Sequence, residues 1–240
     1  MHTERPFAIC FDMDDTLIDG IAAATAAWDI VCAEAAATLG CDATVLRDAI
    51  RREGALFWKD EAAVGHWRLD LEGAREIFVR TALEAESLDP SLAHQISHEY
   101  ARLHRENLRI FDDTIEVLEG VRAAGYATAM ITNGPRPLQR DKIERFGFAP
   151  YFDLIVIEGE FGYGKPHPAV FEHAVATFGV EPARAWHIGD NLYADISGAQ
   201  AVGLHATWIH RDRLKLDPHP VATPDRAIAT LRDLHEPLGL

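Results

Sequence analysis

The sequence predicts an α/β fold, in which a doubly wound parallel sheet is interrupted by an inserted all-helical segment. Short apolar segments without alternation recur along the chain, and such segments are typical of parallel strands buried on both faces. After residue 110, helical stretches of about 10–15 residues separate them, which is the pattern of βαβ units. Between residues 18 and 109 no segment has the character of a strand, so this part of the chain is expected to be helical.

The strands of the sheet are expected at residues 7–11, 127–131, 154–157, 185–188 and 206–209. The intervening helices are expected at 113–124, 136–147, 168–178 and 192–202. A glycine follows each of these helices, as is common just beyond a helix end, namely Gly125, Gly147, Gly179 and Gly203. The C-terminal tail, which is rich in proline, is expected to be a loop with one short helix at about 225–234; its prolines are Pro218, Pro220, Pro224 and Pro237.

The inserted segment is expected to contain helices at about 20–39, 43–53, 60–70, 73–86 and 89–106. Breaks between these helices are expected at Gly40, Gly54, Gly73 and Asp89-Pro90. We therefore predict a Rossmann-like core formed by residues 1–17 and 110–240 and a helical domain formed by residues 18–109. The two crossings between them should lie near Asp19-Gly20 and near residues 107–112.

Composition restricts the partners and the compartment. The 240 residues include 23 basic and 38 acidic side chains, for a net charge of −15. This balance argues against nucleic acid or an anionic membrane as a partner, because both require a basic surface. Three cysteines without a CxxC motif indicate reduced thiols in the cytoplasm. No signal peptide or membrane span is expected, and either a monomer or a homodimer is compatible with the sequence.

Polar residues follow the expected strands, at the point where each strand ends. Because ligands bind outside the carboxyl ends of parallel strands, these residues should converge on one edge of the sheet. The sequences at these ends are Asp12-Met13-Asp14-Asp15-Thr16, Thr132-Asn133-Gly134, Gly164-Lys165-Pro166 and Gly189-Asp190, with Asp195 five residues further on.

This set of residues has a chemical purpose. Clustered carboxylates repel one another unless a cation or a proton intervenes, and hard oxygen ligands in an open site suit Mg²⁺. One carboxylate can attack phosphorus to give an aspartyl-phosphate, and a second can protonate the leaving oxygen and then activate water. The hydroxyl of Thr132, the backbone N–H groups of Asn133-Gly134 and the ammonium of Lys165 can hold the charge of the phosphoryl group.

Taken together, these residues resemble the four motifs of the haloacid dehalogenase-like hydrolases. The motifs are Asp12-x-Asp14-x-Thr16, Thr132, Lys165 and Gly189-Asp190-xxxx-Asp195. The resemblance covers nearly the whole chain, and the helical insertion is similar to the small α-helical cap of this superfamily, the C1 type. Each motif alone is weak, but four motifs in the right order, each at a strand end, are specific.

The resemblance implies a role for each motif residue. Asp12 would be the nucleophile and a metal ligand, and Asp14 the general acid and base, with its backbone carbonyl also on the metal. Thr132 and Lys165 would hold the phosphate, together with Asn133 and Gly134. Asp190 would be a further ligand of Mg²⁺, and Asp195 would orient Lys165 or reach the metal through water.

The acid at position 14 indicates which reaction to expect. Dehalogenase members of the family lack an acid there, so Asp14 implies phosphate transfer. The stretch from Met130 to Phe171 is more similar still to a branch that contains nucleotidases and acylneuraminate-9-phosphate phosphatases. The resemblance therefore implies a phosphatase of a small phosphorylated metabolite, such as a nucleotide or a sugar phosphate.

Two other functions stay open at this point. A phosphomutase of the β-phosphoglucomutase type would use the same residues if the cap excluded water. A remote alternative is a non-enzymatic phospho-receiver module, although receivers take the phosphorylated aspartate from a later strand and lack the helical insertion.

Several side chains also have more than one interpretation. His187, in an expected strand, favours a structural role, and His94 and His98 have a zinc-like spacing that more simply fits a solvated helix face. Asn133 as a turn-former, and Arg136 as a surface residue, remain open.

Overall fold

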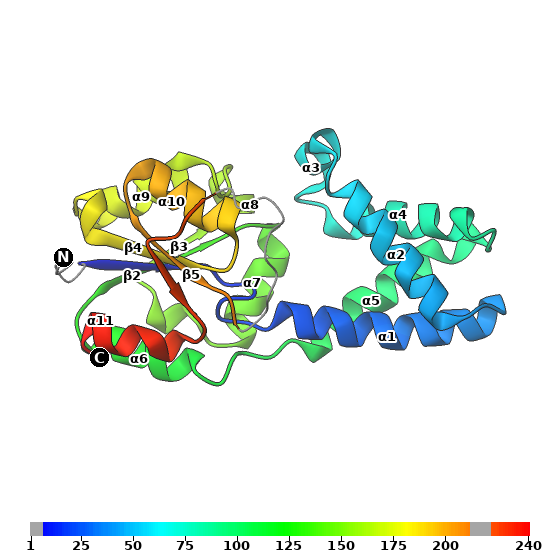
Figure 1. The fold of residues 1–240 in the computed structure, drawn as a ribbon, viewed down its shortest axis with the longest axis horizontal. Helices are drawn as coiled ribbons and strands as arrows, with labels where there is room; N and C mark the ends of the chain where they lie inside the picture. Colours follow the sequence, from blue (N-terminus) through cyan, green and yellow to red (C-terminus); the bar gives the residue numbers. More distant parts are fainter. Residues whose placement is uncertain (1–6, 212–221) are drawn as a thin grey trace. The chain divides into compact units, whose positions relative to one another are not determined.

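The structure is a computed structural model and describes residues 7–211 and 222–240, with the side chains of 61–63 left aside. The chain divides into two compact units, residues 1–18 with 110–240 and residues 19–109 (Figure 1). The sequence places Ile18 in the helical insertion, whereas in the structure Ile18 belongs to the first unit, where it forms an isolated β-bridge with Ile110. The expectations for residues 1–6, Pro218 and Pro220 lie outside the described residues.

The first unit contains a six-stranded parallel sheet with the order β3-β2-β1-β4-β5-β6. Its strands are β1 (Ala8–Phe11), β2 (Ala127–Thr132), β3 (Leu154–Ile157), β4 (Ala185–Gly189), β5 (His205–Ile209) and β6 (Arg226–Ile228). The doubly wound α/β fold expected from the sequence is thus confirmed, because the first strand lies at the centre and the chain winds outward from it in both directions.

The register of the sheet brings the strand ends together. Phe11 is paired with Met130 of β2 and with Ile188 of β4. One residue later, the backbone N–H of Asp12 donates to the carbonyl of Ile188 over 2.9 Å. The carboxyl ends of β1, β2 and β4 therefore lie at the same level, which places their following residues at one edge.

The sixth strand corrects the expectation for the tail. The sequence predicts a helix at 225–234, whereas residues 226–228 pair with Thr207–Ile209 of β5. Asp225 fixes this edge, because its carboxylate accepts the N–H of Ala206 over 2.8 Å. Helical turns follow only afterwards, at Leu231–Leu234 and in α11 (His235–Leu238).

The helices of this unit cover both faces of the sheet (Figure 1). They are α6 (Thr114–Ala123), α7 (Arg136–Arg145), α8 (Glu158–Phe161), α9 (Pro168–Phe178), a π-helical turn (Leu192–Ser197) and α10 (Gly198–Val202). Figure 1 shows α9 and α10 on one face and α6 with α11 on the other. Val170, Phe171 and Ala174 of α9 join the core beneath β1 and β2. A fully buried phenylalanine such as Phe171 contributes about 1.5–3 kcal/mol of hydrophobic stabilisation.

The second unit is entirely helical among the residues described. It contains α1 (Gly20–Leu39), α2 (Ala43–Phe57), α3 (Glu61–Trp67), α4 (Leu71–Ala85), a 3₁₀ turn (Pro90–Leu92) and α5 (Ala93–Asn107). Gly54 and Gly73, expected to be breaks, lie inside α2 and α4. The ring of Phe78 packs over Gly54, where a Cβ would lie 3.4 Å away in ordinary van der Waals contact, and α2 continues through this position.

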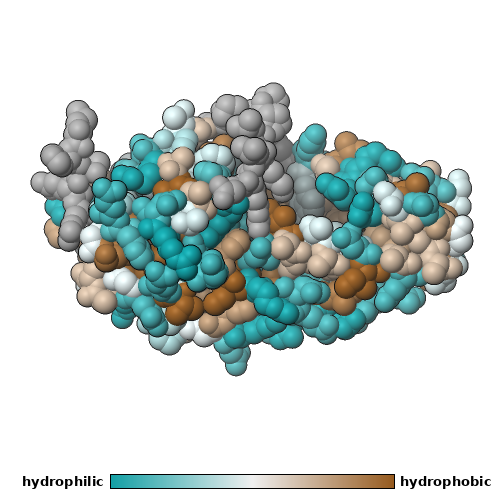
Figure 2. Space-filling model, turned by 60° about the horizontal axis from the view of Figure 1, so that its bottom comes forward, coloured by the Kyte–Doolittle hydropathy of each residue, from teal (hydrophilic) through white to brown (hydrophobic). Residues whose placement is uncertain are grey.

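Helix α1 is long and apolar enough to cross a membrane by length and composition, with a mean hydropathy of 1.3. Four of its residues are buried in the core of the helical unit, Ala27, Val31, Cys32 and Ala36. Trp28 of the same helix stacks on Tyr100 of α5 with ring centroids 4.0 Å apart. These contacts pack one side of α1 against the other helices of its unit, and 28% of its apolar stretch is buried there. On the face drawn in Figure 2, hydrophilic and hydrophobic residues are interspersed.

Candidate active site

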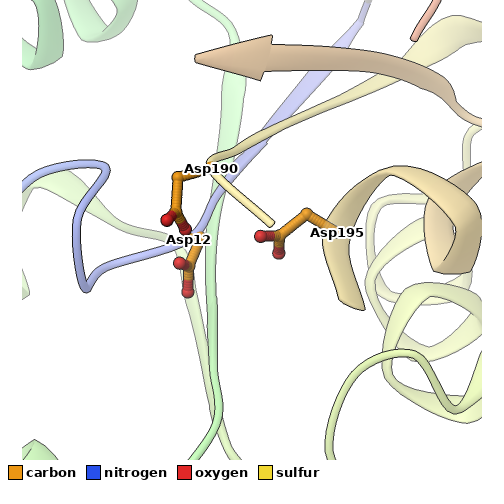
Figure 3. A group of neighbouring side chains, drawn as sticks. All are labelled: Asp12, Asp190 and Asp195. Atoms are coloured by element: carbon orange, nitrogen blue, oxygen red, sulfur yellow. The ribbon is translucent and has the colours of Figure 1, made fainter. Parts of the chain in front are cut away.

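Three aspartates meet at the carboxyl edge of the sheet. Asp12 follows β1, Asp190 follows β4, and Asp195 lies in the π-helical turn after it. One carboxylate oxygen from each lies within 4.8 Å of one from each of the others, and Figure 3 shows the side chains of Asp190 and Asp195 extending toward that of Asp12. Asp12 and Asp195 are almost completely buried. Such a group of hard oxygen donors matches the ligand set that Mg²⁺ prefers.

Lys165 supplies a positive charge to this cluster. Its Nζ lies 2.5 Å from Oδ1 of Asp12 and 2.6 Å from Oδ1 of Asp195, and only 4% of the residue is exposed. Asn133 fixes the loop that carries Lys165. The Oδ1 of Asn133 accepts the Lys165 N–H over 2.7 Å, and its Nδ2 donates to the Lys165 carbonyl over 2.8 Å.

Asp195 is held from several directions. Besides Lys165, its Oδ1 is 2.9 Å from Nε2 of His187, and its Oδ2 accepts the N–H of Asn191 over 3.0 Å. Gly189 leaves the room for this side chain, because a Cβ at position 189 would lie 2.2 Å from Cγ of Asp195. The glycine of the Gly189-Asp190 pair is therefore required by packing. His187 is fully buried in β4 and contacts Asp195, as expected of a structural histidine.

Burial and mutual repulsion shift the pKa values of these groups. Burial raises the pKa of Asp12 to about 7, against the opposing charge of Lys165, and Asp195 adds to the rise. Burial, together with the charges of Asp12 and Asp195, raises the pKa of Asp190 well above its usual range. Burial would also raise the pKa of Asp195, but Lys165 and His187 hold it well below its usual range. A divalent cation would relieve the repulsion between Asp12 and Asp190.

The raised pKa of Asp12 predicts a pH-dependent stability for the metal-free protein. The pKa rises from 3.8 to about 7 on folding, so between these values the folded state holds more protons than the unfolded state. The contribution of this group to stability should therefore fall as the pH rises from about 4 to about 7. We expect the free energy of unfolding of the wild type, measured relative to Asp12→Asn in urea with EDTA, to decrease through that window. A difference that does not change with pH would contradict this expectation.

Asp14 occupies a different environment from Asp12. Its carboxylate lies outside the three-aspartate cluster and contacts α7, where Nζ of Lys142 lies 2.7 Å from Oδ1 and 2.8 Å from Oδ2. Nε2 of Gln139 donates to Oδ2 over 3.0 Å. The family resemblance implies that Asp14 reaches a metal through its backbone carbonyl, and the contacts of its side chain do not conflict with that role.

The turn after β2 is fixed by two further side chains. Gln139 donates to Oγ1 of Thr132 over 2.6 Å and to the carbonyl of Asn133 over 2.8 Å. The buried Glu158 accepts the N–H of Gly134 over 3.0 Å. The sequence predicts this N–H as a phosphate donor, but in the structure Glu158 already occupies it. Thr132 lies at the same edge as Asp12, since β2 is the neighbour of β1.

Sequence reasoning missed Lys142, Gln139 and Glu158. A signal for two of them was present, because Gln139, Lys142 and Ile143 follow the i, i+3, i+4 spacing of one helix face, and all are buried. Polar residues on the buried face of a helix require partners. For Glu158, at the end of a strand, no spacing pointed to the site.

Other side chains weighed from the sequence have ordinary partners. Arg136 pairs with Glu160, the two charged atoms being 3.1 Å apart. The exposed His94 lies 3.0 Å from Glu76, and its ring stacks on that of His98. Among the residues described, these histidines belong to no group of three metal-binding side chains.

Comparisons with known proteins point to one family of hydrolases over most of the length of the chain. Residues 8–203 match the family model of the haloacid dehalogenase-like hydrolases. Phosphoserine phosphatase from Thermus thermophilus is 31% identical, over 94% of this chain and 96% of that protein. N-acylneuraminate-9-phosphatase from Mus musculus is 28% identical, over 92% of this chain and 90% of that protein.

Solved structures share the fold. A haloacid dehalogenase-like hydrolase from Bacillus subtilis superposes with a TM-score of 0.78 at 20% identity, covering 99% of this chain and 100% of that one. A 2-haloacid dehalogenase from Pseudomonas syringae superposes with a TM-score of 0.60 at 30% identity, covering 97% of each chain. The fold therefore accommodates both phosphatases and dehalogenases, and the site residues must distinguish between them.

Proposed function

Since the chain belongs to the haloacid dehalogenase-like hydrolases and is a phosphatase of that family, we propose that it hydrolyses a small phosphomonoester through an aspartyl-phosphate on Asp12. The observation that best supports this mechanism is that the side chains of Asp12 and Asp14 have different partners. The two carboxylates lie two residues apart, yet one contacts Lys165 and the other contacts Lys142. Two acids held in different environments can take different roles in one reaction.

In the first step, a carboxylate oxygen of Asp12 attacks phosphorus and the bond from phosphorus to the leaving oxygen breaks. Asp14 donates its proton to that oxygen, so the product leaves as a neutral alcohol. In the second step, Asp14 takes a proton from water, whose oxygen attacks phosphorus. The bond to Asp12 breaks, and inorganic phosphate leaves. Thr132, the N–H of Asn133 and Lys165 hold the phosphoryl oxygens during both steps.

Mg²⁺ is the cofactor that we propose for this site. Asp12, Asp190 and the backbone carbonyl of Asp14 would be its ligands. Asp195 would not bind the ion directly but would orient Lys165. The donor set fits the ion, because Asp12, Asp190 and Asp195 each have one carboxylate oxygen within 4.8 Å of the others, and burial and repulsion raise the pKa values of Asp12 and Asp190. When bound, Mg²⁺ would neutralise charge on the phosphoryl group.

The substrate class follows from the relatives and from Asp14. The relatives named above act on phosphoserine and on N-acylneuraminate 9-phosphate, which are small phosphomonoesters. Asp14 supports phosphate transfer over carbon–halogen cleavage, because only a leaving oxygen requires a proton. We propose as partner a small phosphorylated metabolite, which includes phosphoserine, nucleotides and sugar phosphates. The free cysteines support a reducing compartment such as the cytoplasm, for a monomer or homodimer.

The proposed function is tested by phosphate release with and without metal. With Mg²⁺, we expect turnover of p-nitrophenyl phosphate and of at least one member of a panel of phosphoserine, nucleoside monophosphates and sugar phosphates. EDTA should abolish turnover, and added Mg²⁺ should restore it, because the carboxylates otherwise repel an anionic ester.

Two outcomes of this test would count against the proposal. Unchanged activity in EDTA would contradict the metal requirement. A sugar phosphate that is isomerised without release of phosphate would favour a phosphomutase.

A further inference from the structure

Lys142 is a buried lysine that the proposed mechanism does not use. It is on α7, 5% exposed, and its ammonium contacts both carboxylate oxygens of Asp14 at 2.7 and 2.8 Å. Lysine is rarely buried without a partner of opposite charge, because desolvation of the ammonium is costly. Asp14 provides that partner from a segment 128 residues away in the sequence.

Gln139 connects the same helix to the phosphate-binding turn. The two N–H groups of its amide share three acceptors within hydrogen-bond distance, Asp14 Oδ2, Thr132 Oγ1 and the carbonyl of Asn133. Gln139 is itself buried, and it lies one helical turn before Lys142. Helix α7 therefore contacts, through two buried side chains, both the second acid of the site and the residue expected to hold phosphate.

These contacts fix the direction of the Asp14 side chain. Both of its oxygens accept hydrogen bonds from α7, while 36% of the side chain remains exposed at the open edge of the sheet. Because one ammonium contacts both oxygens and an amide contacts one of them, few rotamers of the Asp14 side chain can keep all of these contacts. Misplacement of a catalytic group by about 1 Å can cost about a hundredfold in rate, so such contacts matter for a proton donor.

We propose that Lys142, assisted by Gln139, is the positioning residue of the general acid and base Asp14. This inference rests on the proposed phosphatase function. Lys142 touches neither the phosphoryl group nor the leaving oxygen. The contacts with both oxygens of Asp14 belong to its ionised form. When Asp14 is protonated, one oxygen would still accept from Lys142 while the other carries the proton that goes to the leaving oxygen, and in the second step Asp14 takes a proton back from water. The effect of Lys142 should therefore appear only in steps that depend on Asp14.

The leaving group of the substrate provides the test. p-Nitrophenolate leaves readily without a proton, whereas an alkoxide from an alkyl phosphate such as phosphoserine or glycerol phosphate does not. We expect Lys142→Met, which retains the apolar stem, to lower kcat/KM about 10–100-fold for the alkyl phosphate that the wild type turns over best, because kcat/KM reports the steps up to loss of the leaving group. The loss in kcat/KM for p-nitrophenyl phosphate should be several-fold smaller, whereas kcat can fall for both substrates because they share the hydrolysis of the aspartyl-phosphate.

Two further variants complete the experiment. Arg140→Met is the matched control, because Arg140 is an exposed cation on the same helix that pairs with Glu160; its activity should equal that of the wild type. In the Asp14→Asn background, Lys142→Met should cause no further loss, because the group it positions has already lost its function.

The outcomes separate the inference from the proposed function. If the wild type releases no phosphate from any substrate, the phosphatase proposal fails. If the wild type is active but Lys142→Met lowers kcat/KM equally for both substrate types, or lowers the residual activity of Asp14→Asn further by its full factor, the positioning role is wrong. If Lys142→Met does not fold, Lys142→Arg takes its place, since it keeps the charge but changes the geometry and should show the same dependence on leaving group.

Discussion

Replacement of Asp12 by asparagine should abolish phosphate release, by a factor on the order of 10⁴ or more, as expected when the nucleophile of a covalent mechanism is removed. An amide oxygen cannot form the acyl phosphate in place of the carboxylate. Asparagine has nearly the same shape as aspartate, so the fold should persist. The measurement is kcat for p-nitrophenyl phosphate with saturating Mg²⁺, together with circular dichroism of the variant.

The stability of Asp12→Asn makes this result specific. The substitution removes a buried negative charge that repels Asp190 and Asp195, and burial raises the pKa of the group it replaces. In EDTA at pH 8 the variant should be at least as stable as the wild type. Asp48→Asn, at an exposed position of the helical unit, is the matched control and should retain full activity. Intact turnover in Asp12→Asn would refute Asp12 as the nucleophile.

Replacement of Lys165 by methionine should damage both activity and stability. Lys165 is buried and contacts Asp12 and Asp195, so its loss leaves two buried carboxylates without their counter-charge. Burial opposes the charge of Lys165, but the two carboxylates outweigh this and raise the pKa of Lys165 above its usual range. Removing one partner of a buried ion pair costs about 3–5 kcal/mol, and we expect a loss of that order in EDTA at pH 8.

Mg²⁺ should reduce this loss of stability, because the cation neutralises the same carboxylates. Activity should fall about 10²–10³-fold even with saturating Mg²⁺, as when one donor to the transition-state charge is removed. Lys59→Met, the same substitution at an exposed position, should change stability by less than about 0.5 kcal/mol. Urea unfolding with and without Mg²⁺ measures these differences. A Lys165→Met variant as stable as Lys59→Met in EDTA would show that the ion pairs contribute nothing to the fold.

Much of the site was predictable from the sequence because it lies at strand ends. A buried strand has a strong local pattern, and its carboxyl end fixes where the next residues go. For this reason the amino-acid pattern alone was sufficient to group Asp12, Thr132 and Asp190 at one edge. The helix-ending glycines were equally local, since Gly125, Gly147, Gly179 and Gly203 all adopt positive φ.

What the sequence did not reveal depends on partners distant along the chain. Strand β6 has only three residues and exists because β5 offers an edge to pair with. Gly54 has the character of a helix break, but Phe78 packs against it inside a continuous helix. Lys142 resembles a surface lysine of a polar helix, but the fold places Asp14 beside it. In each case a tertiary contact overrode the local preference.

The mechanism requires a covalent phosphoryl group on Asp12, and trapping that group tests the mechanism. The wild-type protein, mixed with p-nitrophenyl phosphate and Mg²⁺ and quenched with acid within the first turnovers, should yield a peptide containing Asp12 that carries one phosphoryl group. This species should accumulate further in Asp14→Asn, in which water is no longer activated for the second step. Continued turnover with no phosphorylated peptide, or with the phosphoryl group on another residue, would contradict the mechanism.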